Sequence, residues 1–240
     1  HGVDTAGIER VEGPSFRWGG EYSSNFNKRT TLFTELNVFE GFDPKLSPEL
    51  RQSPFVFLAN IDPELQMSVL KQVDNRELVA CDTMKFWIEG KLDQLHALLD
   101  DIDVLVINDE EARQLADTYN LVEAAKRIHQ MGPTVLVIKR GEHGVLAFFQ
   151  DEMFHAPGYP LKSVADPTGA GDTFAGGFFG YLAKHGEHGP GAIRRAVVVG
   201  SVMASFCVEK FSVDGLVDLD QREISMRYRA FQRLTDFGEF

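Results

Sequence analysis

The chain has 240 residues, of which 43% are hydrophobic and 25% are charged, and its formal net charge is -12. This length and composition are those of a soluble globular domain with a sizeable core. The acidic balance argues against nucleic-acid binding, which needs a basic face. No stretch reaches the length of a membrane span, and the first residues do not form a signal peptide. We therefore expect a cytoplasmic protein with no nucleic-acid or membrane partner.

Residues 10–37 predict short antiparallel strands. Apolar residues tend to alternate with polar ones here, and Phe16 and Trp18 contribute to a high aromatic content. Gly19-Gly20 is a typical turn pair. Two interpretations follow: the aromatic side chains form a surface that needs a cover, or the segment is a plain solvent-facing hairpin.

After residue 54, apolar strands alternate with helices. The predicted strands cover residues 55–59, 78–81, 104–107 and 135–138, and a predicted hairpin covers 144–149 and 153–156. Helices are predicted to begin at Pro63, after the N-cap Asp62, and at Asp109, and to cover 87–99, 121–131, 170–184 and 192–209. Continuous apolar strands separated by helices predict an α/β fold with a parallel sheet covered on both faces.

Each predicted parallel strand is followed by polar or glycine residues. They include Asn60, Asp82, Asn108, Lys139 and Gly141. Because parallel strands place their carboxyl ends at one edge, where open α/β sheets bind ligands, these residues predict a ligand-binding edge. Any strand-to-helix turn needs similar residues, so the prediction rests on the whole set.

A helix is predicted to begin within the stretch Asp-Pro-Thr-Gly-Ala-Gly-Asp at residues 166–172. Gly169, Ala170 and Gly171 carry little or no side chain, so an anionic oxygen can rest on the free amides of the first helical turn. Asp172 lies beside these amides, where a carboxylate can orient or deprotonate an alcohol. This constellation suits phosphoryl transfer. The alternative is a capped helix terminus without a ligand.

Three glycines inside this predicted helix point to close packing. Gly176, Gly177 and Gly180 each cost about 1 kcal/mol relative to alanine. They predict that backbone or ligand packs closely on that face of the helix.

The stretch from Asp166 to Gly177 resembles the C-terminal signature of the ribokinase (PfkB) family of carbohydrate and nucleoside kinases. That signature is Asp-Thr-x-Gly-Ala-Gly-Asp followed by a small-residue helix, and Pro167 here replaces its Thr. The resemblance implies a three-layer α/β/α fold with a mostly parallel central sheet and a small β lid. It also implies transfer of the γ-phosphoryl group of ATP to a hydroxyl of a sugar or nucleoside. Asp172 would be the catalytic base, and the amides from Gly169 to Asp172 would hold the developing charge.

The same resemblance implies ATP and Mg²⁺ as cofactors and admits a monovalent cation, K⁺. Asn108 and Glu111 would orient the magnesium and the phosphates. Their Asn-x-x-Glu pattern is also that of a capping box, which explains the two residues without any ligand. Lys139, Gly141 and Gly144 would contact the nucleotide, whereas a tight hairpin turn is the alternative explanation of the two glycines.

By resemblance, residues 1–9 end the first αβ part of the main domain, 10–37 form the lid, and 38–240 form the main kinase domain with the ATP site. The family's opening βαβ units, which grip the sugar, have no counterpart in the sequence. We therefore expect an incomplete N-terminal part. In this family the lid covers the sugar and often pairs with a second subunit's lid, which implies a homodimer.

Two other functions remain as alternatives. One is a nucleotide-binding regulatory protein of the same fold without turnover. The other is a nicotinamide-dependent dehydrogenase, which Phe174 disfavours because it stands where a dinucleotide fingerprint needs its third glycine.

Overall fold

The computed structural model describes residues 2–23, 29–149, 151–236 and 238, and a six-stranded sheet forms its centre. The strands lie side by side in chain order. They are β3 (Phe55–Leu58), β4 (Leu78–Cys81), β5 (Val104–Asn108), β6 (Val135–Lys139), β7 (Val145–Phe149) and β8 (Glu152–Ala156). β3 to β6 run parallel, and β7 and β8 add an antiparallel hairpin. The predicted parallel sheet and hairpin are confirmed.

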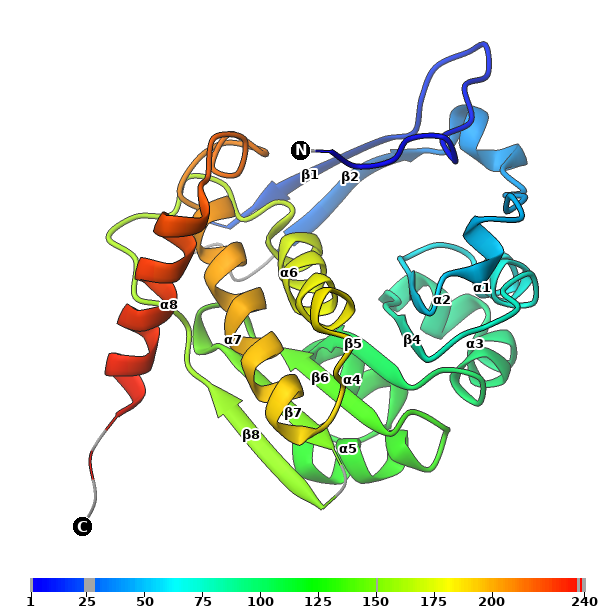
Figure 1. Cartoon of the computed structure of the whole chain (residues 1–240). Coiled ribbons are helices and arrows are strands. Elements are labelled where there is room, and N and C mark those ends of the chain that lie inside the picture. The colour runs from blue at the N-terminus through cyan, green and yellow to red at the C-terminus, as the bar shows by residue number, and fades with distance from the viewer. Residues whose placement is uncertain (1, 24–28, 150, 237, 239–240) are drawn as a thin grey trace.

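Helices cover both faces of this sheet, which gives three α/β/α layers (Figure 1). One face carries α1 (Pro63–Leu70), α2 (Lys85–Gly90), α3 (Leu92–Leu99), α4 (Asp109–Leu115) and α5 (Leu121–His129). The other carries α6 (Ala170–His185), α7 (Pro190–Cys207) and α8 (Gln221–Thr235). Because strand side chains alternate between faces, each strand feeds two cores. Leu105 and Leu136 pack under α1–α5, and Val106 and Val137 pack under α6–α8.

Helices α6 and α7 approach each other closely at two glycines. A β-carbon on Gly177 would lie 3.1 Å from the Cα of Gly200, and one on Gly200 would lie 2.8 Å from the carbonyl oxygen of Phe174. The predicted close packing is confirmed for Gly177. Gly176 and Gly180 are exposed, and no described atom lies within 4 Å of such a β-carbon. For those two glycines the prediction of close backbone packing is wrong.

A separate two-stranded antiparallel sheet forms the lid, from β1 (Arg17–Tyr22) and β2 (Arg29–Glu35). It lies across the top of the molecule in Figure 1. Residues 24–28 of the predicted lid lie outside the described residues. The lid leaves Leu32 62% and Phe33 40% exposed, so apolar side chains face solvent on it.

Gly19 and Gly20 are not the turn that the sequence predicts. They lie inside β1, at a shift in the register with β2. A β-carbon on Gly19 would lie 2.4 Å from Cε1 of Phe33, and one on Gly20 would lie 2.3 Å from Cη2 of Trp18. The two glycines therefore make room for aromatic rings within the lid.

The helices differ from the prediction in two places. The predicted helix 87–99 is split into α2 and α3 at Lys91, whose backbone is not helical (φ -142, ψ 45). The Lys91 ammonium pairs with Asp62 at 2.6 Å and also with Glu64, at the start of α1. The sequence does not predict α8, which begins at a capping box formed by Asp220 and Glu223.

Candidate active site

Three adjacent strands end in polar side chains on one face of the sheet. Asn108, the last residue of β5, pairs in register with Lys139, the last residue of β6, and Asp82 directly follows β4. Each lies two residues after a side chain of the core beneath α6–α8. Those core residues are Ala80, Val106 and Val137. Because strand side chains alternate, Asp82, Asn108 and Lys139 emerge toward α6.

The loop before α6 is fixed by its own hydrogen bonds. The Asp166 carboxylate accepts from the amides of Thr168 at 2.9 Å and Ser212 at 3.4 Å. Burial opposes ionisation of Asp166, but these hydrogen bonds outweigh it and lower the pKa of Asp166. Gly169 then caps α6 in the left-handed region at φ 80, a conformation that glycine adopts without strain. The loop therefore presents the first turn of α6 in a fixed direction.

The first turn of α6 carries two amides without a partner. The first backbone bond of the helix runs from the amide of Thr173 to the carbonyl of Gly169 at 2.8 Å. The amide of Ala170 donates to a carbonyl of the preceding turn at 3.2 Å. Within the described chain, the amides of Gly171 and Asp172 donate to no acceptor. Such a pair of free N–H groups at a helix N-terminus favours an anion.

The ammonium group of Lys139 lies against this turn. A β-carbon on Gly171 would lie 3.2 Å from Nζ of Lys139. The neighbouring Asp172 is exposed. The structure thus brings Lys139, from the end of β6, together with the predicted catalytic stretch at residues 169–172.

Asp82 adds a buried carboxylate to this group. It is 7% exposed, the amide of Asn60 donates to it, and its Oδ1 has no partner among the described residues. Burial raises the pKa of Asp82 to about 7. The positive charge of Lys139 opposes this rise, and the negative charges of Asp172 and Glu111 add to it. Three charged side chains at this edge therefore act on Asp82.

Asn108 and Glu111 form the capping box that one sequence interpretation predicts. The side chain of Asn108 accepts from the amide of Glu111 at 2.8 Å, and the Glu111 carboxylate accepts from the amide of Asn108 at 2.8 Å. The box fixes both side chains beside Lys139 and Asp82. It is compatible with a role toward a metal, which stays a prediction.

The carboxylates at this edge fit a magnesium ion held mainly by other ligands. Mg²⁺ takes oxygen ligands and usually keeps several waters and phosphate oxygens beside one or two carboxylates. Asp82 offers a buried oxygen without a partner. Within the described ranges, no three His, Cys, Asp or Glu side chains gather to hold an ion by themselves. A nucleotide's phosphates would thus have to complete the coordination.

The two glycines of the turn after β6, Gly141 and Gly144, have different surroundings. Gly144 is buried at φ 81, and a β-carbon on it would lie 2.0 Å from the carbonyl oxygen of Ala156. Close backbone contact therefore explains Gly144 without a ligand. Gly141, at φ 53, is exposed, with no described atom within 4 Å of such a β-carbon. It leaves its side of the turn accessible to a nucleotide.

The lid contacts the loop before α6. The hydroxyl of Thr168 lies 3.1 Å from that of Tyr22, at the end of β1, across 146 residues of sequence. Figure 1 shows the two lid strands above α6 in this view. The lid thus reaches the candidate site itself.

The family model for pfkB family carbohydrate kinases matches residues 20–214. The chain belongs to the pfkB family. The match includes the end of β1, all of β2, the polar strand ends and the first turn of α6, so the stretch that carries the sequence resemblance lies within it. None of the helices in the described ranges is long and apolar enough to span a membrane.

Curated relatives of the chain are named as kinases of different acceptors, a nucleoside in one case and a sugar in another. The chain is 32% identical over 126 residues to a cytidine kinase of Thermococcus kodakarensis, covering 50% of this chain and 45% of the relative. It is 30% identical over 164 residues to a fructokinase of Salmonella thompson, covering 66% of this chain and 59% of the relative. The chain spans about half the length of the curated relatives it matches.

Solved structures of this family share the fold. The nucleoside kinase of Methanocaldococcus jannaschii, described as an archaeal member of the ribokinase family, aligns with a TM-score of 0.71 at 19% identity, over 92% of this chain and 70% of that chain. A probable sugar kinase of Rhizobium etli aligns with a TM-score of 0.74 at 17% identity, over 92% of this chain and 69% of that chain. The predicted ribokinase-like fold is confirmed.

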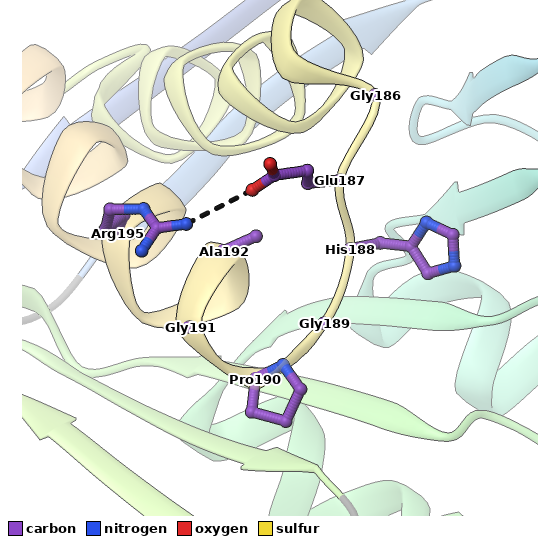
Figure 2. A pocket seen from close by; sticks show the side chains of 8 residues that line it. All are labelled: Gly186, Glu187, His188, Gly189, Pro190, Gly191, Ala192 and Arg195. Carbon is purple, nitrogen blue, oxygen red and sulfur yellow. Dashed lines mark hydrogen bonds and ion pairs between the residues drawn. The ribbon is translucent and has the colours of Figure 1, made fainter.

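The candidate site does not coincide with the pocket shown in Figure 2. That pocket, of about 390 Å³, is lined by residues 186–192 and Arg195, at the turn between α6 and α7. Glu187 points toward Arg195 and pairs with it at 3.3 Å. α6 has 16 residues, so this pocket lies about 24 Å from the first turn.

Two features of the site are missed by sequence reasoning. The sequence marks Asp82 only as the residue after a strand, and the alternation of strand side chains could have placed it on the α6 face. The contact between Tyr22 and Thr168 joins residues far apart in the chain, and nothing in the sequence pairs them.

Proposed function

We propose that the protein is an ATP-dependent kinase that transfers the γ-phosphoryl group to a hydroxyl of a sugar or nucleoside. The observation that carries this proposal is the first turn of α6, where the free amides of Gly171 and Asp172 lie beside the Lys139 ammonium. Such a group stabilises negative charge, and the adjacent Asp172 carboxylate can act on an alcohol. Membership of the pfkB family supports the same reaction.

In this proposal, the exposed carboxylate of Asp172 orients the acceptor hydroxyl and takes its proton. The amides at the start of α6 hold the charge on the transferring phosphoryl group. Asn108 and Glu111 orient the magnesium, which, when bound, neutralises charge on the β- and γ-phosphates. Lys139 and the accessible Gly141 contact the nucleotide, and Gly144 shapes that turn.

The lid supports two further parts of the proposal. Its contact with Thr168 supports a role in covering an acceptor bound near Asp172. Its exposed apolar side chains, which include Leu32 and Phe33, are suited to pairing with the lid of a second subunit in a homodimer.

The test uses the full-length protein. ATP with magnesium should raise its melting temperature, and NAD should not, because a ligand that binds the folded state stabilises it. A panel of sugars and nucleosides, with cytidine and fructose included, should then identify an acceptor by ADP release. A shift with NAD alone would contradict the proposal. ATP binding without turnover on the whole panel would favour the regulatory alternative.

A further inference from the structure

Lys139 has a partly buried charge, and no direct contact among the described residues compensates for that burial. Its side chain is half-buried, and its ammonium makes no hydrogen bond and no ion pair within 4.0 Å in the described part of the chain. Other half-buried lysines can be partnered, as Lys91 is by Asp62 and Glu64. Lys139 is therefore a partly desolvated cation without a direct counterion.

The electrostatic environment of this ammonium is mixed. It lies beside the N-terminus of α6, where the helix dipole and the free amides of Gly171 and Asp172 disfavour a positive charge. One carboxylate acts in the opposite sense without direct contact. Asp82 interacts favourably with Lys139 through the protein interior. It can thus stabilise the ammonium without forming an ion pair with it.

A cation that lies beside two free N–H groups can form with them a site for an anion with several oxygens. Phosphoryl oxygens meet this requirement, and the exposed Asp172 carboxylate belongs to the same helical turn. Arrangements of donors that are fixed before the reaction stabilise charge where it develops in the transition state.

We infer that Lys139 is a catalytic residue, whose ammonium binds the phosphoryl group during transfer opposite the amides of Gly171 and Asp172. This inference rests on the proposed kinase function. In the step, the bond between the γ-phosphorus and the β–γ bridging oxygen breaks, and a bond to the acceptor oxygen forms. ADP leaves with the electron pair, and the acceptor's proton passes to Asp172. Lys139 keeps its proton and binds a non-bridging oxygen throughout.

The experiment compares Lys139→Met, which changes the lysine beside the first turn of α6, with Lys184→Met at the last turn of α6. Lys184 is exposed in the last turn of α6, so Lys184→Met removes an equal charge far from the site. For Lys139→Met, kcat should fall roughly 10²–10³-fold, as for the loss of one transition-state donor, and the KM for ATP should change less than about 3-fold. Lys139→Arg should recover at least about 10-fold of this loss. Lys184→Met should leave both constants unchanged.

Two further measurements separate catalysis from other roles. The complex of magnesium, ADP and aluminium fluoride with an acceptor mimics the transferring group, so Lys139→Met should weaken it far more than it weakens ADP alone. The melting temperature of Lys139→Met should stay the same or rise, because a cation leaves a helix N-terminus. The inference is overturned if kcat is unchanged, if only the KM for ATP rises, or if the melting temperature falls enough to explain the lost rate. If wild-type protein turns over no acceptor, the kinase function itself fails first.

Discussion

The two ends of α6 differ in whether their polar groups find partners. At the last turn, His185 bonds to the carbonyl oxygen of Tyr181 at 2.9 Å, and Arg195 bonds to the Tyr181 hydroxyl and to Glu187. At the first turn, the amides of Gly171 and Asp172 and the nearby ammonium of Lys139 find none within the described chain. The polar side chains near the last turn thus have partners, whereas the two amides and the ammonium at the first turn have none among the described residues.

This difference bears on which end of α6 is functional. A pocket of about 390 Å³ lies beside Arg195, and Arg195 and Glu187 there already pair with one another. Free N–H groups beside a partly buried ammonium favour an anionic ligand. We therefore propose the first turn as the catalytic end of α6.

The largest expected effect comes from Asp172→Asn. A positioned acid–base group contributes roughly 10²–10⁴-fold to a rate, so kcat on the best acceptor should fall by at least the lower figure. Affinity for ATP should stay near the wild-type value because the amides remain. Glu187→Gln at the other end of α6 is the matched control and should change neither quantity. An Asp172→Asn protein as fast as wild type would end the catalytic assignment.

The next largest effect concerns Asp82 and pH. Since burial raises its pKa from 3.8 in the unfolded chain to about 7, the folded state binds the proton more tightly, and stability falls as pH rises between these values. Without nucleotide or magnesium, Asp82→Asn should be more stable than wild type at pH 8 by roughly 2–4 kcal/mol. Near pH 4 this gain should vanish. Urea denaturation at both pH values measures it, and a variant equally stable at pH 8 would refute the buried-charge account.

Two adjacent glycines test the middle of α6. Gly177→Ala should destabilise the protein by about 1–3 kcal/mol, because its β-carbon meets Gly200 and Met203 of α7. Gly176→Ala should instead stabilise by about 0.5–1 kcal/mol, because its β-carbon faces open space and alanine favours a helix. Thermal denaturation of both variants checks the difference, and the same sign for both would disprove it.

The smallest effect on stability comes from Glu111→Gln. A glutamine can still accept the hydrogen bond from the amide of Asn108, so the free energy of unfolding should fall by less than about 1 kcal/mol. If Glu111 serves magnesium, the concentration of magnesium at half-maximal rate should nevertheless rise. Comparison with Glu111→Ala separates the two roles, because alanine loses both the hydrogen bond and the charge whereas glutamine loses only the charge. An unchanged magnesium requirement in both variants would leave the capping box as the whole role of Glu111.

Much of the fold follows from local pattern, and the site follows less completely. Apolar runs such as residues 104–107 and 135–138 indicate buried strands because they are short, rich in β-branched residues and bounded by turn residues. Helix boundaries near Lys91 escape prediction because an ion pair with α1 decides them. The raised pKa of Asp82 arises only from its burial and from charges on other elements, which the sequence does not reveal. The proximity of Lys139 to Gly171 likewise depends on how α6 packs on the sheet.

Hydrogen exchange with and without ATP and magnesium tests the central claim most directly, because it compares the two ends of α6 in one experiment. A nucleotide whose phosphates rest on the first turn should slow exchange at the amides of Gly171 and Asp172. Exchange in residues 186–191, at the pocket beside Arg195, should stay unchanged. Slowed exchange at residues 186–191 with none at Gly171 and Asp172 would contradict the assignment of the active site.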